Sequence, residues 1–296
     1  MITRNEEAWL DECLEHLKPL HPEFIIVDTG STDRTKEIGA AHGARILETT
    51  WDDDFSRPRN LSLKEATRPW ILVIDPDERI ATRDILRLRE LTEKANLKAY
   101  AFQTRNYVRT KTNGNSYSSD GSYEEEKDYP FFFLSCKVRL FRNGLNIHFK
   151  GVVHETVSDS VVHACKPGEF EEADIIFHHY GTDPDLMKKK NKRALYKKLT
   201  EKKIIDEPQN PEAFIEFARE CLHAGENERA LAAFYRAHQL DSTSPYYLLE
   251  LVRAFFKSDR GLESKSFLEK GIQLDPNNLE YQKFYHQLKS FQNQQT

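Results

Sequence analysis

The feature that most constrains the fold of this chain is a pair of short apolar runs that each end in an aspartate. Residues 24–27 are closed by Asp28, and residues 70–74 are closed by Asp75. An apolar run without polar alternation is typical of a strand covered on both faces, as in a parallel sheet. Helical patterns between the runs predict an α/β domain with right-handed crossovers. Ligands of such domains bind beyond the carboxyl ends of the strands, where both aspartates stand.

Signals for further elements lie between these two runs. A serine, a threonine and an aspartate at residues 31–33 are candidate N-caps for a helix over residues 35–42. A strand over residues 44–47 and a helix over residues 61–66 follow from the same kind of pattern.

The start of the chain departs from this pattern. A helix over residues 6–17 would ordinarily follow a first strand, but only residues 1–3 precede it. We therefore expect either an unusually short first strand or a protein whose start lies upstream of Met1.

The middle of the chain predicts a long loop followed by more strands. Residues 106–128 are polar and rich in Asn, Ser, Gly and Tyr, which indicates a functional loop or flap. Strand-like segments return at residues 131–135, 137–141, 151–155 and 175–181. A basic helix over residues 187–203 then leads away from this domain.

Beyond residue 210 the sequence repeats itself. Pro211 and Pro245 are 34 residues apart, and so are Leu240 and Leu274. The same shift pairs Phe217 with Leu251, Phe234 with Leu268 and Ala237 with Gly271. A 34-residue period with helical apolar spacing is the signature of tetratricopeptide repeats.

The length of the chain agrees with more than one domain, because domains contain about 100–200 residues and this chain has 296. We predict an α/β domain over residues 1–185 and a linking or capping helix over residues 186–209. Tetratricopeptide-like repeats are expected over residues 210–296.

Charge and hydropathy exclude several classes of protein. A net charge of −5 argues against a nucleic-acid partner bound through bulk charge. The apolar runs are far shorter than the ~20 residues of a membrane span, and the first residues show no signal-peptide core. The 4 cysteines lack CxxC spacing, which is typical of free thiols in a reducing compartment. We therefore expect a cytoplasmic protein with no transmembrane segment.

The sharpest signal for chemistry is the motif Asp75-Pro76-Asp77, at the end of a predicted strand. Two carboxylates at this spacing can share one hard cation through their oxygens. Such a cation would neutralise a diphosphate leaving group. A bare motif of this kind is common by chance on surface turns, but its position after an apolar strand favours a function.

The turn from Asp28 to Asp33 has two interpretations. It can be a strand-to-helix turn in which Gly30 relaxes the backbone and hydroxyl groups cap the helix. It can also seat a nucleotide, because Asp28 and its neighbours can bond a base or ribose and a helix N-terminus favours negative charge. Both can hold together. The sequence contains no GxGxxG fingerprint, which disfavours a dinucleotide cofactor.

Other polar residues stand near the expected strand ends. Arg59, followed by Asn60, can reach a diphosphate or anchor an aspartate, although a plain surface role fits the pattern equally well. Glu155, with His154 beside it, is a candidate general base. His179 can complete a metal site with the acidic motif. The competing interpretation of each histidine is a structural side chain.

Several motifs follow one another in an order that resembles a known family. They are Asn5-Glu6-Glu7, residues 27–33, residues 51–55, Arg59-Asn60, residues 74–78, residues 139–142, residues 151–155 and residues 179–181. Together they resemble the family-2 glycosyltransferases of the GT-A fold. The bacterial proteins that join this domain to tetratricopeptide repeats are the most similar group, and the resemblance covers nearly the whole chain.

The resemblance implies a fold, a reaction and a set of residues. The fold is a GT-A domain, with a Rossmann-like mixed sheet in three layers, followed by all-α tetratricopeptide-like repeats. The reaction uses a nucleotide-diphosphate sugar and a divalent metal, Mg²⁺ or Mn²⁺, and inverts the anomeric carbon by direct displacement. Carried over by position, the nucleotide-sugar-binding residues are Asn5, Asp28, Thr29, Ser31, Asp33, Arg59, Asn60 and Asp75. The metal ligands are Asp75, Asp77 and His179, and the catalytic residues are Glu155 as base and His154.

Two departures from the family pattern affect these expectations. Pro76 replaces the small residue usual between the two acids, and its fixed φ narrows the geometry of the motif. A short first strand removes backbone that normally packs beneath the base, which predicts weak donor binding if nothing lies upstream. Relatives that glycosylate peptides, some of them on cysteine, make a peptide acceptor conceivable beside a glycan or small molecule. We expect residues 106–128 to form part of the acceptor pocket.

The leading hypothesis is a cytoplasmic, metal-dependent, inverting glycosyltransferase whose repeats present a peptide or protein acceptor or recruit a partner. The alternative is a catalytically degenerate domain that serves as a scaffold for the repeats, and the short first strand motivates it. A nucleotidyltransferase shares the metal chemistry, but no Gly-rich triphosphate loop is found in the sequence, so this hypothesis ranks last. The donor sugar, its nucleotide and the acceptor are not encoded in any motif.

Overall fold

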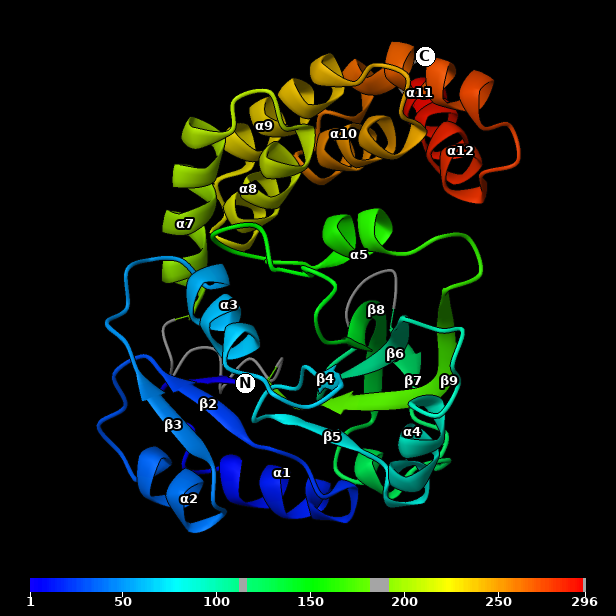
Figure 1. The fold of residues 1–296 in the computed structure, drawn as a ribbon. Helices are drawn as coiled ribbons and strands as arrows, with labels where there is room; N and C mark the ends of the chain where they lie inside the picture. The colour runs from blue at the N-terminus through cyan, green and yellow to red at the C-terminus, as the bar shows by residue number, and fades with distance from the viewer. Residues whose placement is uncertain (112–115, 182–191, 295–296) are drawn as a thin grey trace. The chain divides into compact units, whose positions relative to one another are not determined.

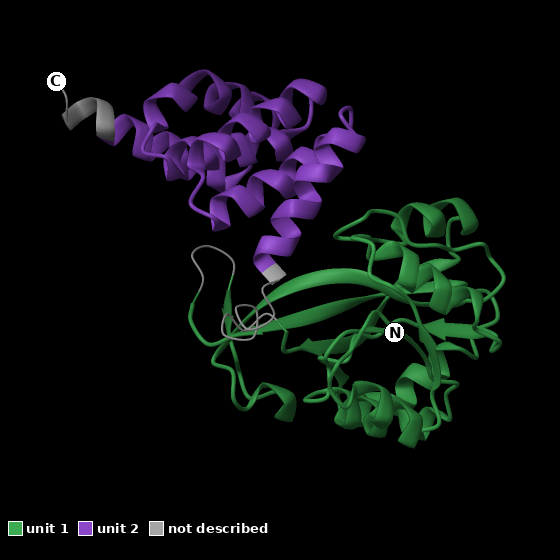
Figure 2. Ribbon diagram, turned by 90° about the vertical axis from the view of Figure 1, so that its left-hand side faces the viewer, with its two compact units in different colours: residues 1–190 green, residues 191–296 purple. Residues whose placement is uncertain are grey.

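The computed structural model describes residues 1–111, 116–181 and 192–294 (Figure 1). The chain divides into two compact units, Met1–Lys190 and Asn191–Thr296, which Figure 2 colours separately. The predicted boundary between residues 185 and 186, and the predicted start of the basic helix at residue 187, lie outside the described residues.

The first unit opens with a small parallel sheet. Its strands are β1 (Ile2–Thr3), β2 (Ile25–Asp28) and β3 (Arg45–Glu48), in the order β1-β2-β3. The accompanying helices are α1 (Leu10–Leu17), the 3-10 turn η1 (Lys18–Leu20), α2 (Thr35–Ala41) and α3 (Ser56–Lys64). The strands expected at residues 24–27 and 44–47 are confirmed with a shift of one residue. The short first strand is also confirmed, because β1 has 2 residues.

A larger mixed sheet forms the rest of this unit. Its strands are β4 (Trp70–Leu72), β5 (Glu78–Ile80), β6 (Ala99–Val108), β8 (Phe131–Arg142) and β9 (Phe170–His179), with β7 (Tyr117–Ser118) paired to β8. The strand order is β4-β8-β6-β9-β5, and only the β6–β9 pairing among these is parallel. The connections contain α4 (Ile85–Leu91), α5 (Ser158–Ala164) and the 3-10 turns η2 (Thr82–Asp84) and η3 (Glu124–Glu126). The mixed sheet and its helices confirm the GT-A-like fold class.

The larger sheet corrects two expectations drawn from the sequence. The apolar pattern places residues 70–74 in the parallel sheet, whereas β4 pairs antiparallel with β8. The strands expected at residues 131–135 and 137–141 are one continuous strand, β8, of 12 residues. Cys136, between them, pairs with Gln103 in the same ladder, so a polar interruption in the pattern does not break the strand.

Residues 151–155 form a loop, and the expectation of a strand there is wrong. Gly151 has a φ of 107° and His154 a φ of 52°, left-handed values that interrupt an extended chain. Lys150 and Thr156 close the loop, since each backbone N–H donates to the other residue's carbonyl at 3.0 and 3.1 Å. The two adjacent valines produce the apolar pattern, but only Val153 is buried.

The main core of the first unit lies where the larger sheet packs against α1 and α4. Tyr100 and Phe102 from β6 and Phe177 from β9 are 0% exposed, and Leu17 and Leu88 from the two helices pack in the same cluster. β6 lies between β8 and β9, which explains why most of its side chains are buried. This core holds the β4–β5 turn and the end of β9 in fixed positions.

A cavity of about 520 Å³ lies between the two sheets of this unit. Ile26 of β2, Leu72 of β4 and Leu14 of α1 are among its mostly apolar lining residues, and Arg59 reaches one side of it.

The second unit is a series of paired helices. They are α7 (Lys192–Asp206), α8 (Pro211–His223), α9 (Asn227–Leu240), α10 (Pro245–Lys257), the 3-10 turn η4 (Gly261–Ser264), α11 (Lys265–Leu274) and α12 (Leu279–Gln294). Pro211 and Pro245 each stand at the start of a helix, where a missing N–H costs no hydrogen bond. Three of the pairs related by the 34-residue shift are buried: Phe217 and Leu251, Phe234 and Leu268, and Ala237 and Gly271. The tetratricopeptide-like prediction is confirmed.

Among the residues that the structure describes, no helix combines the length and the apolar character needed to cross a bilayer.

Close helix packing at Gly271 generates a stability prediction. A Cβ added there would lie 2.2 Å from Cε1 of Tyr281. The ring of Tyr281 cannot easily move away, because its hydroxyl donates a hydrogen bond to the Pro245 carbonyl at 2.6 Å. Gly271→Ala should therefore fall in the upper part of the ~1–3 kcal/mol cost of overpacking, which outweighs alanine's gain in helix propensity of about 1 kcal/mol. Urea unfolding followed by far-ultraviolet circular dichroism measures the change.

The matched control is Gln273→Ala on the exposed side of the same helix, which should shift the free energy of unfolding by less than about 0.5 kcal/mol. Equal stability of the two variants would contradict this packing argument.

Candidate functional site

Two strand-to-helix turns, after β1 and after β2, are interlocked by hydrogen bonds. The Asn5 N–H donates to Ser31 Oγ at 2.9 Å, and the Thr32 N–H donates back to Asn5 Oδ1 at 2.8 Å. The Glu7 N–H donates to Asp33 Oδ2 at 3.1 Å. Asn5, Ser31 and Asp33, expected to bind the nucleotide sugar, therefore build a clasp between the turns.

Asp28 lies at the base of this clasp and is 1% exposed. Its carboxylate accepts hydrogen bonds from Thr3 Oγ1 at 3.0 Å, the Gly30 N–H at 3.0 Å, the Ser31 N–H at 2.8 Å and Ser31 Oγ. Burial raises the pKa of Asp28, but the bonds from Ser31 and Gly30 outweigh burial and hold it below its ordinary value. Thr29 Oγ1 donates to the Thr3 carbonyl at 3.1 Å. Gly30 has a φ of 103°, so the relaxed backbone of the structural interpretation is confirmed. The expected helix cap at residues 31–33 is wrong, because the N-cap of α2 is Arg34 and no side chain caps it. Nucleotide binding by Asp28 and Thr29 stays a prediction.

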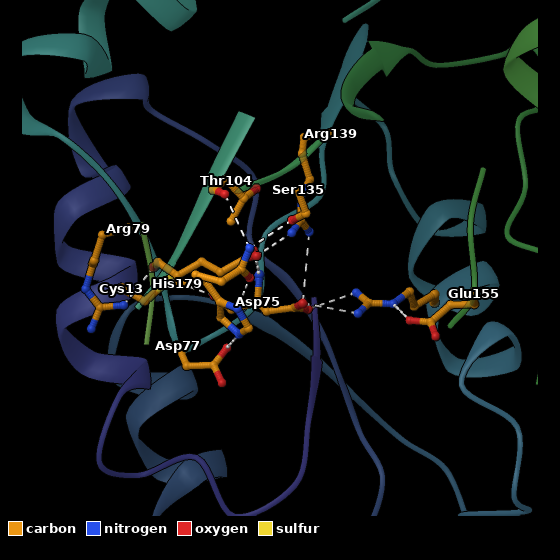
Figure 3. A network of polar contacts seen from close by, with 12 residues as sticks. Cys13, Asp75, Asp77, Arg79, Thr104, Ser135, Arg139, Glu155 and His179 are labelled. Atoms are coloured by element: carbon orange, nitrogen blue, oxygen red, sulfur yellow. Dashed lines mark hydrogen bonds and ion pairs between the residues drawn. The ribbon is translucent and has the colours of Figure 1, made fainter. Parts of the chain in front are cut away.

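A chain of alternating charges surrounds Asp75, which follows β4 (Figure 3). Arg59 Nη1 lies 2.9 Å from Asp75 Oδ1, and Arg139 Nη1 lies 3.9 Å from Asp75 Oδ2. The outer ends are closed by carboxylates, because Arg59 also pairs with Glu155 and Arg139 with Glu78. Burial raises the pKa of Asp75, but the two arginines outweigh burial and hold it well below its ordinary range. Asp75 is therefore ionised and held by cationic side chains.

The helix α3 positions the central arginine of this network. The Arg59 guanidinium lies over the Phe149 ring, 5.3 Å from its centroid. The neighbouring Asn60 fixes the same stretch of chain, because its Nδ2 donates to the Phe149 carbonyl at 2.9 Å and its Oδ1 accepts from the Phe149 N–H at 2.7 Å. Asn60, expected near the nucleotide sugar, thus anchors the segment that leads into the loop at residues 151–155.

Asp77 and His179 form a second cluster. His179 Nε2 lies 3.6 Å from Asp77 Oδ1, and Asp77 is 6% exposed (Figure 3). Burial lowers the pKa of His179, but the charge of Asp77 outweighs burial and raises it. A Cβ added at Gly181 would lie 2.0 Å from Asp77 Oδ2 and 2.8 Å from His179 Nε2. Only glycine therefore allows the backbone to approach both groups.

The donor atoms of Asp77 and His179 fit a divalent cation. A carboxylate oxygen and an imidazole nitrogen bind such ions at about 2.0–2.2 Å, and their separation of 3.6 Å allows both to bind one ion. Asp75 instead faces its arginines, so its expected metal role would need Arg59 to move. The described residues contain no group of three or more His, Cys, Asp or Glu side chains that could hold a metal ion. Water or a ligand would have to supply the remaining positions.

The two expected catalytic residues lie in the loop at residues 151–155. Glu155 is directed toward Arg59, and its side chain is 11% exposed. His154 is exposed, at the tight turn where φ is positive. The structure thus brings Arg59, Asp75 and Glu155 into one network and Asp77 and His179 into a neighbouring pair.

Sequence reasoning missed two members of the charge network, Arg139 and Glu78. Both lie inside motifs that the family resemblance includes, residues 139–142 and 74–78. Arg139 and Glu78 are 3% and 1% exposed, and two buried side chains of opposite charge indicate an ion pair. A sequence alone does not show which charged residues are buried.

A buried histidine supports the strand that carries His179. His178 is 0% exposed, and its Nδ1 lies 2.7 Å from the Tyr107 hydroxyl. Burial and the nearby charges of Arg105 and Arg83 lower the pKa of His178 to about 3. The neutral imidazole is therefore the form that the fold accommodates.

Comparisons with known proteins agree with this architecture. Residues 1–149 match the family model described as glycosyl transferase family 2. The chain is 31% identical to a TPR repeat-containing protein of Synechococcus elongatus over 71% of this chain and 48% of that protein. It is 26% identical to the SPbeta prophage-derived glycosyltransferase SunS of Bacillus subtilis over 78% of this chain and 50% of that protein. The chain thus spans about half the length of these curated relatives.

The fold is also that of a solved structure. S. aureus TarS 1-349, crystallised in complex with UDP-GlcNAc, aligns with a TM-score of 0.52 at 13% identity. The alignment covers 91% of this chain and 90% of that one. At this identity the likeness extends to the fold alone.

The buried position of His178 generates a prediction about pH. Its pKa is lowered from 6.5 to about 3, so the unfolded chain binds more protons than the folded chain between these values. The free energy of unfolding must then fall as the pH drops through this window, by up to ~1.4 kcal/mol per pH unit from this group. His178→Gln should remove that part of the slope, measured by urea unfolding at a series of pH values.

The control is Val162→Gln, because this side chain is 75% exposed and carries no titratable group, so the slope should stay unchanged. An unchanged slope in His178→Gln would mean that His178 is already protonated in the folded protein.

The Arg59 network generates a prediction about stability. Arg59→Met leaves Asp75 and Glu155, which are 22% and 11% exposed, without their shared cation. Removing one partner of a buried ion pair costs about 3–5 kcal/mol. Arg57→Met on the same helix removes an arginine that is 71% exposed, and an exposed pair is worth about 0–1 kcal/mol. If thermal unfolding showed equal losses for both variants, the Arg59 network would not be a structural requirement.

Proposed function

The chain belongs to glycosyl transferase family 2, and on that premise we propose that it transfers a sugar from a nucleotide-diphosphate sugar to an acceptor with inversion at the anomeric carbon. The observation that carries this proposal is the pair Asp77 and His179, whose donor atoms stand 3.6 Å apart at the end of the larger sheet. A UDP-sugar is the first donor to test, because the TarS structure with this fold contains UDP-GlcNAc.

In the proposed reaction, Asp77 and His179 would hold Mg²⁺ or Mn²⁺. The ion, when bound, supplies positive charge that stabilises the departing diphosphate. Arg59 and Arg139 keep Asp75 ionised and fixed in place, so that the turn carrying Asp77 keeps its shape. Asp75 would also contact the ribose or the metal, as the family resemblance implies.

The acceptor is deprotonated as it attacks. Its O–H or S–H bond breaks, the new bond to the anomeric carbon forms, and the bond from that carbon to the diphosphate oxygen breaks with its electron pair on oxygen. We assign the proton to Glu155, with His154 as the neighbouring alternative. Arg59 binds Oε1 of Glu155, which leaves Oε2 as the oxygen that would take the proton.

The helical unit is proposed to present a peptide or protein acceptor, or to recruit a partner, in the cytoplasm. Its helices α8, α10 and α12 carry a row of alternating charges. Arg219 Nη2 lies 3.5 Å from Glu250 Oε1, Arg253 pairs with the same carboxylate, and Arg253 Nε donates to Glu280 at 3.0 Å. Such a row supports a polar partner rather than an apolar one.

The test is nucleotide release from a panel of UDP- and GDP-sugars by the whole chain, with Mn²⁺ or Mg²⁺ and with chelator. We expect release that depends on the cation and falls at least about 100-fold in Asp77→Asn, because a lost metal ligand removes several kcal/mol of charge stabilisation. Asp174→Asn on the same strand as His179, with a side chain that is 99% exposed, is the control and should retain the rate.

Two results would contradict the proposal. Full activity of Asp77→Asn, or of the wild type in chelator, would remove the cation from the reaction. Nucleotide binding without turnover of any donor would favour the scaffold hypothesis.

A further inference from the structure

A buried amide lies directly behind the proposed cation site. Asn106 is on β6, opposite Phe133 of β8 on one side and His179 of β9 on the other. It is 4% exposed, so every polar atom of its side chain needs a partner within the protein.

The partners of Asn106 determine which way its amide points. Nδ2 lies 3.3 Å from the Thr104 carbonyl, 3.2 Å from the Phe133 carbonyl and 3.0 Å from Ser135 Oγ. Carbonyl oxygens accept hydrogen bonds and cannot donate them, so the amide nitrogen must face this side. The amide oxygen is therefore directed at His179.

This orientation fixes the protonation of the imidazole ring. Asn106 Oδ1 lies 2.9 Å from His179 Nδ1, and an amide oxygen accepts only, so Nδ1 must carry the hydrogen. In the neutral ring the lone pair is then on Nε2, the atom that faces Asp77 at 3.6 Å. The metal-binding nitrogen of a ligand histidine is set in the same way, by the hydrogen bond that its other nitrogen makes.

We propose that Asn106 is the positioning residue that holds His179 in the tautomer whose Nε2 binds the divalent cation with Asp77, and that this nitrogen ligand makes the site prefer Mn²⁺ to Mg²⁺. This inference rests on the cation site of the proposed function and extends it to a residue that no motif in the sequence marks. Asn106 acts through His179 and does not itself touch the ion.

The preference for Mn²⁺ follows from the donor set. Mg²⁺ takes oxygen ligands and gives up its bound water reluctantly. Replacing one of these waters by an imidazole nitrogen is therefore unfavourable. First-row transition metals, beginning with Mn²⁺, accept nitrogen and oxygen together. The backbone at Gly181, which admits no Cβ beside Asp77 and His179, limits how far the pair can rearrange to suit a different ion.

The test is binding of Mn²⁺ alone to the whole chain, followed by electron paramagnetic resonance. Pulsed spectra should show coupling of Mn²⁺ to an imidazole ¹⁴N in the wild type and none in His179→Gln. Asn106→Leu, similar in size but without the acceptor, should weaken Mn²⁺ binding by about 10–100-fold. The affinity for Mg²⁺, measured by competition, should fall much less. The ratio of the Mn²⁺ and Mg²⁺ affinities should therefore change, which a merely structural role of Asn106 would not produce.

Ser135→Ala is the matched control, because it removes one partner of the Asn106 amide nitrogen and leaves the bond to His179. It should keep the wild-type ratio. A second measurement needs no variant in the site: ¹⁵N-histidine NMR of the metal-free protein at alkaline pH should show His179 with hydrogen on Nδ1 and none on Nε2. This NMR measurement tests the tautomer of His179 even if Asn106→Leu does not fold.

Three results would overturn the inference: hydrogen on Nε2, no nitrogen coupling in the wild type, or equal losses of Mn²⁺ and Mg²⁺ binding in Asn106→Leu. Neither spectroscopic experiment contains a sugar donor. Failure of the proposed function can therefore be distinguished from failure of the inference about Asn106. Nitrogen-coupled Mn²⁺ with no turnover of any donor would contradict the transfer reaction and support the role of Asn106. Turnover without nitrogen coupling would contradict the role of Asn106 alone.

Discussion

The ion pair between Arg59 and Asp75 is the interaction on which the candidate site depends. It joins a helix of the first part of the chain to the turn that carries the acidic motif, and through Glu155 it also fixes the loop at residues 151–155. Arg139 and Glu78 extend the pairing into the larger sheet. Buried charges of one sign would be costly, and the alternation of signs offsets this cost. The site is therefore built around a network in which each arginine lies between carboxylates of opposite charge.

The two aspartates of the motif have different partners and therefore different roles. Asp75 is occupied by arginines, whereas Asp77, two residues further on, faces His179 across 3.6 Å. Asp28 is likewise held within the protein, because its oxygens accept hydrogen bonds from Thr3, Gly30 and Ser31. Its expected nucleotide role stays a prediction. The GT-A-like first unit thus combines this charge network with a second, mostly buried pair of donor groups, Asp77 and His179.

The sequence predicted what local patterns encode. The repeats were recoverable because each helix carries its own periodic apolar face, as Phe217 and Leu251 show. The strands of the small sheet were recoverable from continuous apolar runs. The partner of β4 was not, because β8 lies far along the chain and only its register with Trp70 reveals the pairing. Of the site, the motif and its neighbours were found, whereas Asn106 was missed because its meaning arises from pairing with β9.

The central claim is that Asp77 and His179 bind the cation while Asp75 stays paired with arginines. Its most direct test is a crystal structure of the chain with UDP and Mn²⁺, with the ion located by its anomalous scattering. We expect Mn²⁺ between Asp77 and His179 Nε2, with UDP phosphate oxygens completing the shell and Asp75 still paired with Arg59 and Arg139. An ion bound by Asp75, with Arg59 displaced and His179 turned away, would contradict it.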